Sequence, residues 1–122
     1  MNTILLVEDD QALNMAFRTV LTKAGYNVVS AFHGLEALEY LSDNQPQLIL
    51  LDLLMPKLNG INFLKRYQPT VNHPTVRIIV FSNLDTEPEI AEAMQLGAHK
   101  YLLKADTTPK QLVESVKATL KT

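Results

Sequence analysis

Polar residues follow four apolar runs of the 122-residue chain, at the point where each run ends. They are four acids, a hydroxyl and an amine: Glu8, Asp9, Asp10, Asp52, Ser82 and Lys104. Carboxylates that lie close together repel one another, so such a group requires a cation. Oxygen ligands favour a hard ion such as Mg²⁺, while a lysine and a hydroxyl can bind phosphoryl oxygens. These residue types predict a phosphoryl group held on a carboxylate beside Mg²⁺.

Each of these residues also has an ordinary structural role when it is considered alone. Asp10 precedes a helical pattern and is the expected N-cap of that helix, whereas Glu8 and Asp9 can be turn residues. Asp52 has no such role, because the Leu-Leu-Met-Pro that follows it begins no helix. Lys104 alone can be a surface lysine. Because four of five predicted strands end in this way, we infer that the residues form one site.

The segments that must position these residues alternate between short apolar runs and helical periods. The apolar runs cover residues 3–7, 27–31, 47–51, 77–81 and 101–103. Continuous apolar runs are typical of parallel strands that are covered on both faces. The helical patterns cover residues 12–24, 35–41, 61–67, 86–97 and 108–120. Capping boxes are predicted for Thr86 with Glu89 and for Thr108 with Gln111.

The order of these elements predicts the fold. Five strand–helix units joined by short links require right-handed crossovers, and therefore a parallel sheet with helices on both faces. This is a doubly wound α/β domain, and one such domain accounts for residues 1–122. Ligand sites of such sheets form outside the carboxyl ends of the strands, where the strand order reverses. The polar residues described above fall at that edge.

Composition narrows the possible classes of function. The chain is 47% hydrophobic and 20% charged, with a net charge of −2 and no basic run, so no direct nucleic-acid contact is expected. It has no cysteine, which excludes disulfides and thiolate metal sites. No apolar stretch approaches the length of a membrane span, and the first strand begins too early to leave room for a signal peptide. We therefore expect a cytoplasmic protein without membrane association.

Four motifs in order along the chain resemble the receiver domain of two-component response regulators, of the kind typified by the chemotaxis regulator. They are Ile4-Leu5-Leu6-Val7-Glu8-Asp9-Asp10, Leu50-Leu51-Asp52-Leu53-Leu54-Met55-Pro56 with Gly60, Ile79-Val80-Phe81-Ser82, and Gly97-Ala98-His99-Lys100-Tyr101-Leu102-Leu103-Lys104. The resemblance runs from end to end. It implies a flavodoxin-like (βα)5 fold, a three-layer sandwich whose five parallel strands have the order 2-1-3-4-5.

The resemblance also implies a role for each site residue. Asp52 would accept a phosphoryl group and become a 4-aspartylphosphate. Mg²⁺ would be bound by Asp9, Asp52 and the backbone carbonyl of Leu54, and by Glu8 through water. Lys104 would contact the phosphoryl group. Ser82 would contact it and act as a switch residue, with Tyr101 as the switch aromatic.

A phosphorylation switch is the function implied by this resemblance. The phosphoryl donor would be a histidine kinase or a histidine phosphotransfer protein, and the surface of the last two helices and last strand would bind an unknown downstream protein. The domain would be no enzyme beyond its own phosphoryl transfer and dephosphorylation. We expect a free-standing monomer or weak homodimer, although a module of a larger regulator would look the same. The alternative is a receiver-fold interaction module that signals without phosphorylation.

Three departures from the family pattern affect the expected site. Asn83 stands where the family usually has a small residue after Ser82, and Ala105 stands where Lys104 is usually followed by proline. His99-Lys100 replaces the acidic pair of the winged-helix branch, which argues against the dimer of that branch. The positions two beyond Asp52 and Ser82, which influence phosphoryl lifetime in the family, are both leucine here, so we expect slow decay.

Other phosphoryl-handling and nucleotide-binding classes fit the chain less well. A haloacid-dehalogenase-type hydrolase needs a second aspartate two residues after the first, and Leu54 occupies that place. A nucleotide-binding α/β protein would carry a glycine-rich loop after the first strand, and Val7-Glu8-Asp9-Asp10-Gln11-Ala12 contains no glycine. A receiver domain therefore remains the best-supported class of protein.

Overall fold

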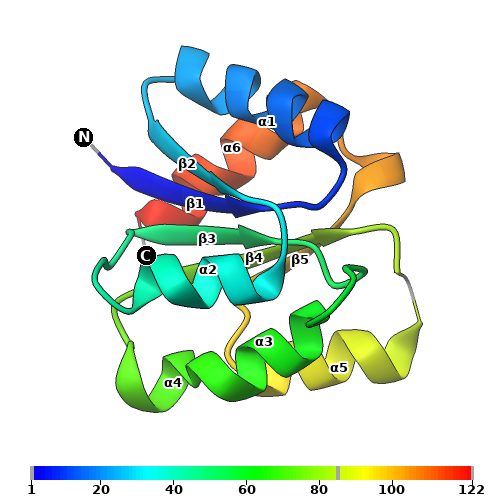
Figure 1. The fold of residues 1–122 in the computed structure, drawn as a ribbon. Coiled ribbons are helices and arrows are strands. Elements are labelled where there is room, and N and C mark those ends of the chain that lie inside the picture. The colour runs from blue at the N-terminus through cyan, green and yellow to red at the C-terminus, as the bar shows by residue number, and fades with distance from the viewer. Residues whose placement is uncertain (1, 85, 122) are drawn as a thin grey trace.

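A computed structural model describes residues 2–84 and 86–121. Five strands and the helices between them alternate along the chain (Figure 1). The strands are β1 (Thr3–Val7), β2 (Asn27–Ala31), β3 (Leu48–Leu51), β4 (Arg77–Ser82) and β5 (Lys100–Leu103). The helices are α1 (Gln11–Lys23), α2 (Gly34–Leu41), α3 (Gly60–Tyr67), α4 (Pro69–Asn72), α5 (Glu87–Gln95), the 3₁₀ turn η1 (Lys104–Asp106) and α6 (Pro109–Leu120).

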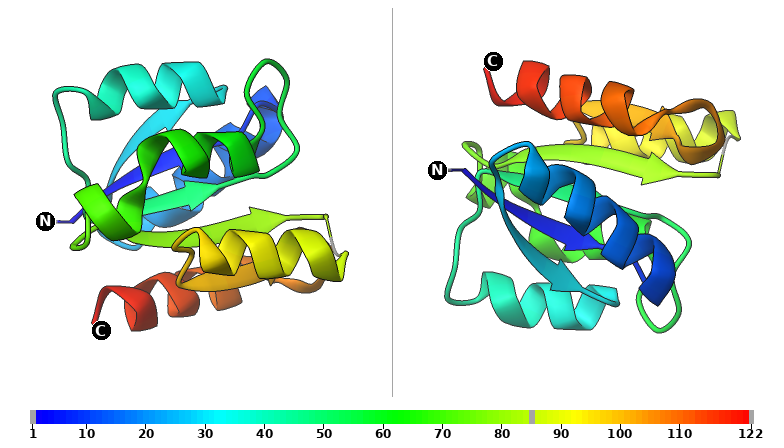
Figure 2. Two further views of the ribbon diagram at one scale, coloured as in Figure 1. Left: turned by 90° about the horizontal axis from the view of Figure 1, so that it is seen from below. Right: turned by 90° about the horizontal axis from the view of Figure 1, so that it is seen from above.

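The strands form one parallel sheet in the order β2-β1-β3-β4-β5, which confirms the predicted topology. Helices α1 and α6 cover one face, and α2, α3 and α5 cover the other (Figures 1 and 2). The chain order of the strands reverses between β1 and β3. The carboxyl ends of these two neighbours therefore lie side by side at the centre of the sheet, which is the expected place for a site.

The central strands β1, β3 and β4 are buried because each face of the sheet has its own helical layer. Alternate side chains of the central strands pack under α2, α3 and α5, and the others pack under α1 and α6. The first set contains Leu5, Val7, Ile49, Leu51, Ile78 and Val80, and the second contains Ile4, Leu6, Leu48, Leu50, Ile79 and Phe81. This two-sided burial explains why the strands are continuous apolar runs in the sequence.

Local sequence signals set most helix starts. The Asp10 side chain accepts a hydrogen bond from the Leu13 N–H and caps α1, as predicted. Thr108 and Gln111 form the predicted capping box of α6. The predicted capping box at Thr86 is wrong, because its hydroxyl donates to the Glu89 carboxylate and accepts no bond from the helix backbone.

Two features differ from the sequence prediction. The short helix α4, which begins at Pro69, lies in the link between α3 and β4, where no helix was predicted. Ser82 is the last residue of β4 rather than the first residue after it, since it pairs with Leu103. Among residues 2–84 and 86–121, no helix is long and apolar enough to cross a bilayer.

Candidate functional site

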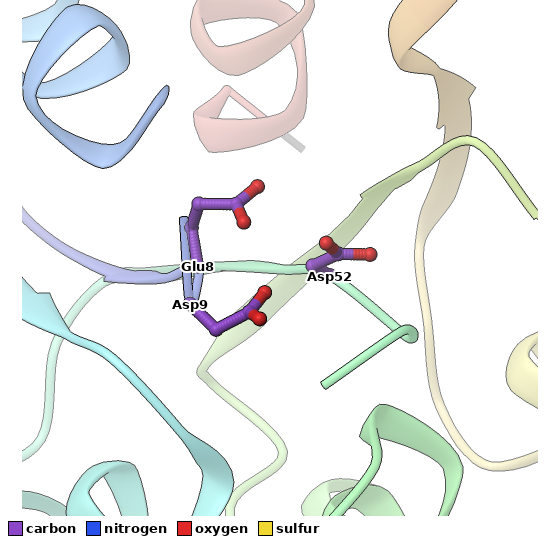
Figure 3. Close-up of side chains that lie close together, drawn as sticks. All are labelled: Glu8, Asp9 and Asp52. Carbon is purple, nitrogen blue, oxygen red and sulfur yellow. The ribbon is translucent and has the colours of Figure 1, made fainter. Parts of the chain in front are cut away.

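Three carboxylates gather at the ends of β1 and β3 (Figure 3). Glu8 and Asp9 follow β1, Asp52 follows β3, and one oxygen of each lies within 4.8 Å of the others. Glu8 is 2% and Asp52 6% exposed, whereas Asp9 is half-buried. Buried carboxylates at this spacing repel one another and favour a bound cation. The oxygen-only donor set suits a hard divalent ion.

Lys104 contacts both of the buried acids. Its Nζ lies 2.8 Å from Asp52 Oδ2 and also donates a hydrogen bond to the Glu8 carboxylate. Burial alone would lower the pKa of Lys104, but its hydrogen bonds to Asp52 and Glu8, and their charges, raise it above the usual value. Burial raises the pKa of Glu8, which the bonds from Lys104 and the Asp10 N–H offset only in part.

Asp52 accepts hydrogen bonds at both carboxylate oxygens. The fully buried Ser82 donates from Oγ to Asp52 Oδ1 at 2.7 Å, and the Leu54 N–H donates to the same oxygen at 3.0 Å. Lys104 contacts the other oxygen. A group attached to Asp52 would therefore meet a hydroxyl and an ammonium that are already in place.

Tyr101 lies on β5 next to the loop that follows β4. Its hydroxyl donates a hydrogen bond to the backbone carbonyl of Leu84, and the side chain is half-buried. Leu84 lies two residues beyond Ser82, and its N–H donates to Ser82 Oγ at 3.3 Å. The predicted switch residues are thus connected through this one loop.

Gly60 fixes the loop that leaves Asp52. Its N–H donates to the Leu53 carbonyl, and a Cβ at this position would meet the Asp52 carbonyl oxygen and the Leu53 Cα at 2.7 Å each. Both atoms belong to the backbone and cannot move aside easily. The glycine quoted in the sequence motif is therefore required by the close approach of α3 to the end of β3.

Asn14 is a site-supporting residue that the sequence analysis missed. It is 2% exposed, and its Nδ2 donates to the Glu8 carbonyl at 3.0 Å. Its Oδ1 accepts from Ser30 Oγ at 2.7 Å, and Ser30 Oγ in turn accepts from Arg18. This network ties the backbone of Glu8 to α1 and β2. The sequence offered one signal for this role. Asn14 is a poor helix former, and it lies on the same face of α1 as the buried Leu21.

The structure brings together five of the predicted site residues: Glu8, Asp9, Asp52, Ser82 and Lys104. Tyr101 is connected to the site through the loop at Leu84, and Leu54 contacts Asp52 through its N–H. One carboxylate held by two hydrogen-bond donors, with two further acids beside it, is an arrangement that can stabilise phosphoryl transfer.

Comparison with known proteins assigns the class of this domain. Residues 4–117 match the model of the response regulator receiver domain, and the chain belongs to this family of signalling proteins. It is 37% identical over 121 residues to the transcriptional regulatory protein CpxR of Escherichia coli, covering 99% of this chain and 50% of CpxR. It is 32% identical to the chemotaxis protein CheY of Thermotoga maritima, covering 93% of this chain and 92% of CheY.

Solved structures show the same fold over the whole chain. A CheY-like receiver domain from Methanospirillum hungatei superposes with a TM-score of 0.91 at 25% identity, covering 99% of this chain and 94% of that one. A Francisella response regulator receiver domain gives 0.88 at 29% identity, covering 99% and 98%. The chain spans about half the length of the CpxR proteins that it matches. As a receiver homologous to CpxR and CheY, it is consistent with phosphorylation-switched two-component signalling.

Proposed function

We propose that Asp52 is the phosphoacceptor of this receiver and that a histidine kinase or histidine phosphotransfer protein supplies the phosphoryl group. The observation that carries this proposal is the convergence of donors on one carboxylate. Lys104 contacts one oxygen of Asp52, and Ser82 contacts the other. Neither Asp9 nor Asp10 has this pair of partners in the described hydrogen bonds, and the Asp10 side chain caps α1.

We propose Mg²⁺ as the cofactor, held by Glu8, Asp9, Asp52 and the backbone carbonyl of Leu54. The three carboxylates fit a hard divalent ion because their oxygens lie within 4.8 Å of one another. When bound, Mg²⁺ neutralises charge on the oxygens of the transferring phosphoryl group.

In the transfer step, an oxygen of the Asp52 carboxylate attacks the phosphorus of a phosphohistidine. The phosphorus–nitrogen bond breaks, and the imidazole leaves with the electron pair. Lys104 and Ser82 exchange their bonds to the carboxylate for bonds to phosphoryl oxygens, which places positive charge and a donor where negative charge accumulates. Hydrolysis of the aspartyl phosphate by water regenerates the carboxylate. In this proposal the domain catalyses only its own phosphorylation and dephosphorylation.

Phosphorylation would then alter the surface of α5, β5 and α6. A dianionic group on Asp52 holds Ser82, and the loop between Ser82 and Leu84 transmits this change to the Tyr101 hydroxyl. A downstream protein that prefers the resulting surface binds more tightly. We propose that the domain acts in the cytoplasm as a monomer or weak homodimer without direct nucleic-acid contact. Retention of the whole site opposes a phosphorylation-independent module.

Intact mass spectrometry after incubation with acetyl phosphate tests this function. The expected result is a gain of one phosphoryl group that requires Mg²⁺ and is absent from Asp52→Asn. Asp43→Asn is the matched control, because Asp43 is an exposed acid outside the site. If acetyl phosphate adds no phosphoryl group, the same assay is repeated with a phosphorylated histidine phosphotransfer protein as the donor. Failure with both donors would reject the proposal.

A further inference from the structure

Two departures from the family pattern meet in the structure. The Ala105 N–H donates a hydrogen bond to Asn83 Oδ1 at 3.0 Å. Asn83 directly follows Ser82 at the end of β4, and Ala105 directly follows Lys104 in η1. The bond therefore connects the residue after the phosphoryl-binding hydroxyl with the residue after the phosphoryl-binding amine.

Neither half of this bond exists in the usual family pattern. Proline at position 105 would have no N–H to donate, and a small residue such as alanine at position 83 would have no side-chain acceptor. The two substitutions are thus complementary. Each creates a group that the other needs, although they lie 22 residues apart in the sequence.

The bond also extends the connection between β4 and β5 beyond their ladder. The last paired residues of the two strands are Ser82 and Leu103. Past this pair, β4 continues into the loop to α5, and β5 turns into η1. In the described part of the chain, the other hydrogen bonds to backbone groups of the turn are local: Thr107 donates to the carbonyls of Leu103 and Lys104. The Asn83 side chain instead connects η1 to the end of β4, which is not the strand that leads into this turn.

We propose that Asn83 is a positioning residue that, through the Ala105 N–H, keeps Lys104 seated against Asp52 and Glu8. This inference rests on the proposed function, because the seated amine matters only if it binds the phosphoryl group. A fixed backbone at Ala105 limits the conformations open to the long lysine side chain. The bond therefore raises the rate of phosphoryl transfer to Asp52.

Amide hydrogen exchange tests the bond itself, independently of phosphorylation. Asn83 and Ala105 are both exposed, so water can replace the lost partner and the fold persists in the variants. Asn83→Leu keeps the bulk and removes the acceptor, and we expect the Ala105 amide to exchange about fivefold faster. Asn83→Asp keeps an acceptor oxygen and retains protection. Equal exchange in the wild type and Asn83→Leu overturns the inference.

The rate of phosphorylation by acetyl phosphate in Mg²⁺ tests the positioning role. We expect Asn83→Ala and Ala105→Pro each to lower the rate constant about threefold. The double variant should be no slower than either single variant, since one lost bond accounts for both effects. Ala105→Ser keeps the N–H without the added backbone freedom of glycine and should retain the wild-type rate. Multiplying effects in the double variant contradict the role.

The same variants separate positioning from simple obstruction of the site by the Asn83 side chain. Obstruction predicts that Asn83→Ala accelerates phosphorylation, so a faster rate overturns the positioning role.

The proposed function and the role of Asn83 can also be rejected separately. If the wild type accepts no phosphoryl group from any donor, the proposed function fails and the rate effect with it. If the wild type is phosphorylated and the variants match it, only the role of Asn83 fails.

Discussion

The two ends of the parallel sheet satisfy their polar groups in different ways. At the carboxyl end, buried charges pair across the sheet, as Lys104 does with Asp52 and Glu8. At the amino end, the polar partners are rings and backbone groups. For example, His99 Nδ1 accepts a hydrogen bond from the Ile78 N–H at 3.1 Å. A cavity of about 240 Å³ lies there, beside α4.

Aromatic rings stack on one another at the amino end. The Tyr67 ring lies between Phe63 and His73, with ring centres 5.7 and 4.2 Å away. Burial raises the pKa of Tyr67 to about 12, so this tyrosine stays neutral. The comparison indicates that the amino end contributes stability through packing, whereas the carboxyl end retains repelling charges, which is typical of functional sites.

Removal of the Lys104 ammonium group should have the largest effect on stability. Lys104→Met leaves the carboxylates of Glu8 and Asp52 buried without their amine, and we expect a loss of about 3 kcal/mol in the free energy of unfolding. Added Mg²⁺ should recover part of this loss because it restores positive charge. Urea denaturation with and without Mg²⁺ measures both effects. Lys110→Met, at an exposed position, is the control, and an equal response of the two variants contradicts the interpretation.

Two glycines allow the ends of the sheet to be compared directly. A Cβ at Gly60 meets backbone atoms of Asp52 and Leu53, and a Cβ at Gly97 meets Thr70 Oγ1 at 2.7 Å with φ at +115°. We expect Gly60→Ala and Gly97→Ala each to cost about 2 kcal/mol of unfolding free energy. Gly60→Ala should also weaken Mg²⁺ binding, measured by calorimetry. An equal loss of Mg²⁺ affinity in Gly97→Ala would show that the two ends are coupled.

The apolar rim of the site should govern the lifetime of the phosphoryl group. Leu54 and Leu84 line one groove of about 600 Å³ together with Leu53, the residue after Asp52, and neither leucine side chain can orient an attacking water. We expect the phosphorylated protein to decay slowly in Mg²⁺ buffer and Leu54→Asn to decay several-fold faster. Phosphate release after removal of the donor measures both rates. Decay within seconds in the wild type, unchanged in Leu54→Asn, sinks this hypothesis.

The pH response of the amino end should be the smallest effect. Burial, with a contribution from Arg77, lowers the pKa of His99 from its usual 6.5. The unfolded chain therefore binds a proton more readily, so stability is full above about pH 6.5 and falls as the pH decreases below it. His99→Asn keeps an acceptor for the Ile78 N–H and should flatten the decrease slightly. Thermal denaturation between pH 7 and pH 5 decides whether the two proteins differ.

Local sequence signals predicted most of the fold, because each strand and helix carries its own pattern. The five strands and the caps at Asp10 and Thr108 follow from residues close together in the chain, whereas the strand order was implied by the resemblance to receiver domains. The convergence of the strand-end residues was also predictable, since parallel strands place their carboxyl ends at one edge.

Side-chain bonds between distant segments were not predictable in this way. Asn14 contacts Ser30 on another element, and Asn83 contacts the N–H of Ala105. The sequence shows Asn83 and Ala105 only as two separate departures, since neither residue indicates the position of the other. Helix α4 is not predictable from the pattern of residues 61–67, because a proline shortly after a helical pattern usually marks its end, whereas Pro69 is the first residue of another helix.

Chemical mapping of the phosphorylated residue tests the central claim most directly. Borohydride reduces an aspartyl phosphate to homoserine, and peptide mass spectrometry then locates the change after treatment with acetyl phosphate and Mg²⁺. The convergence of Lys104 and Ser82 predicts the change at Asp52. Reduction at Asp9 or Asp10, or no reduced residue in a protein that has gained a phosphoryl group, would contradict the assignment.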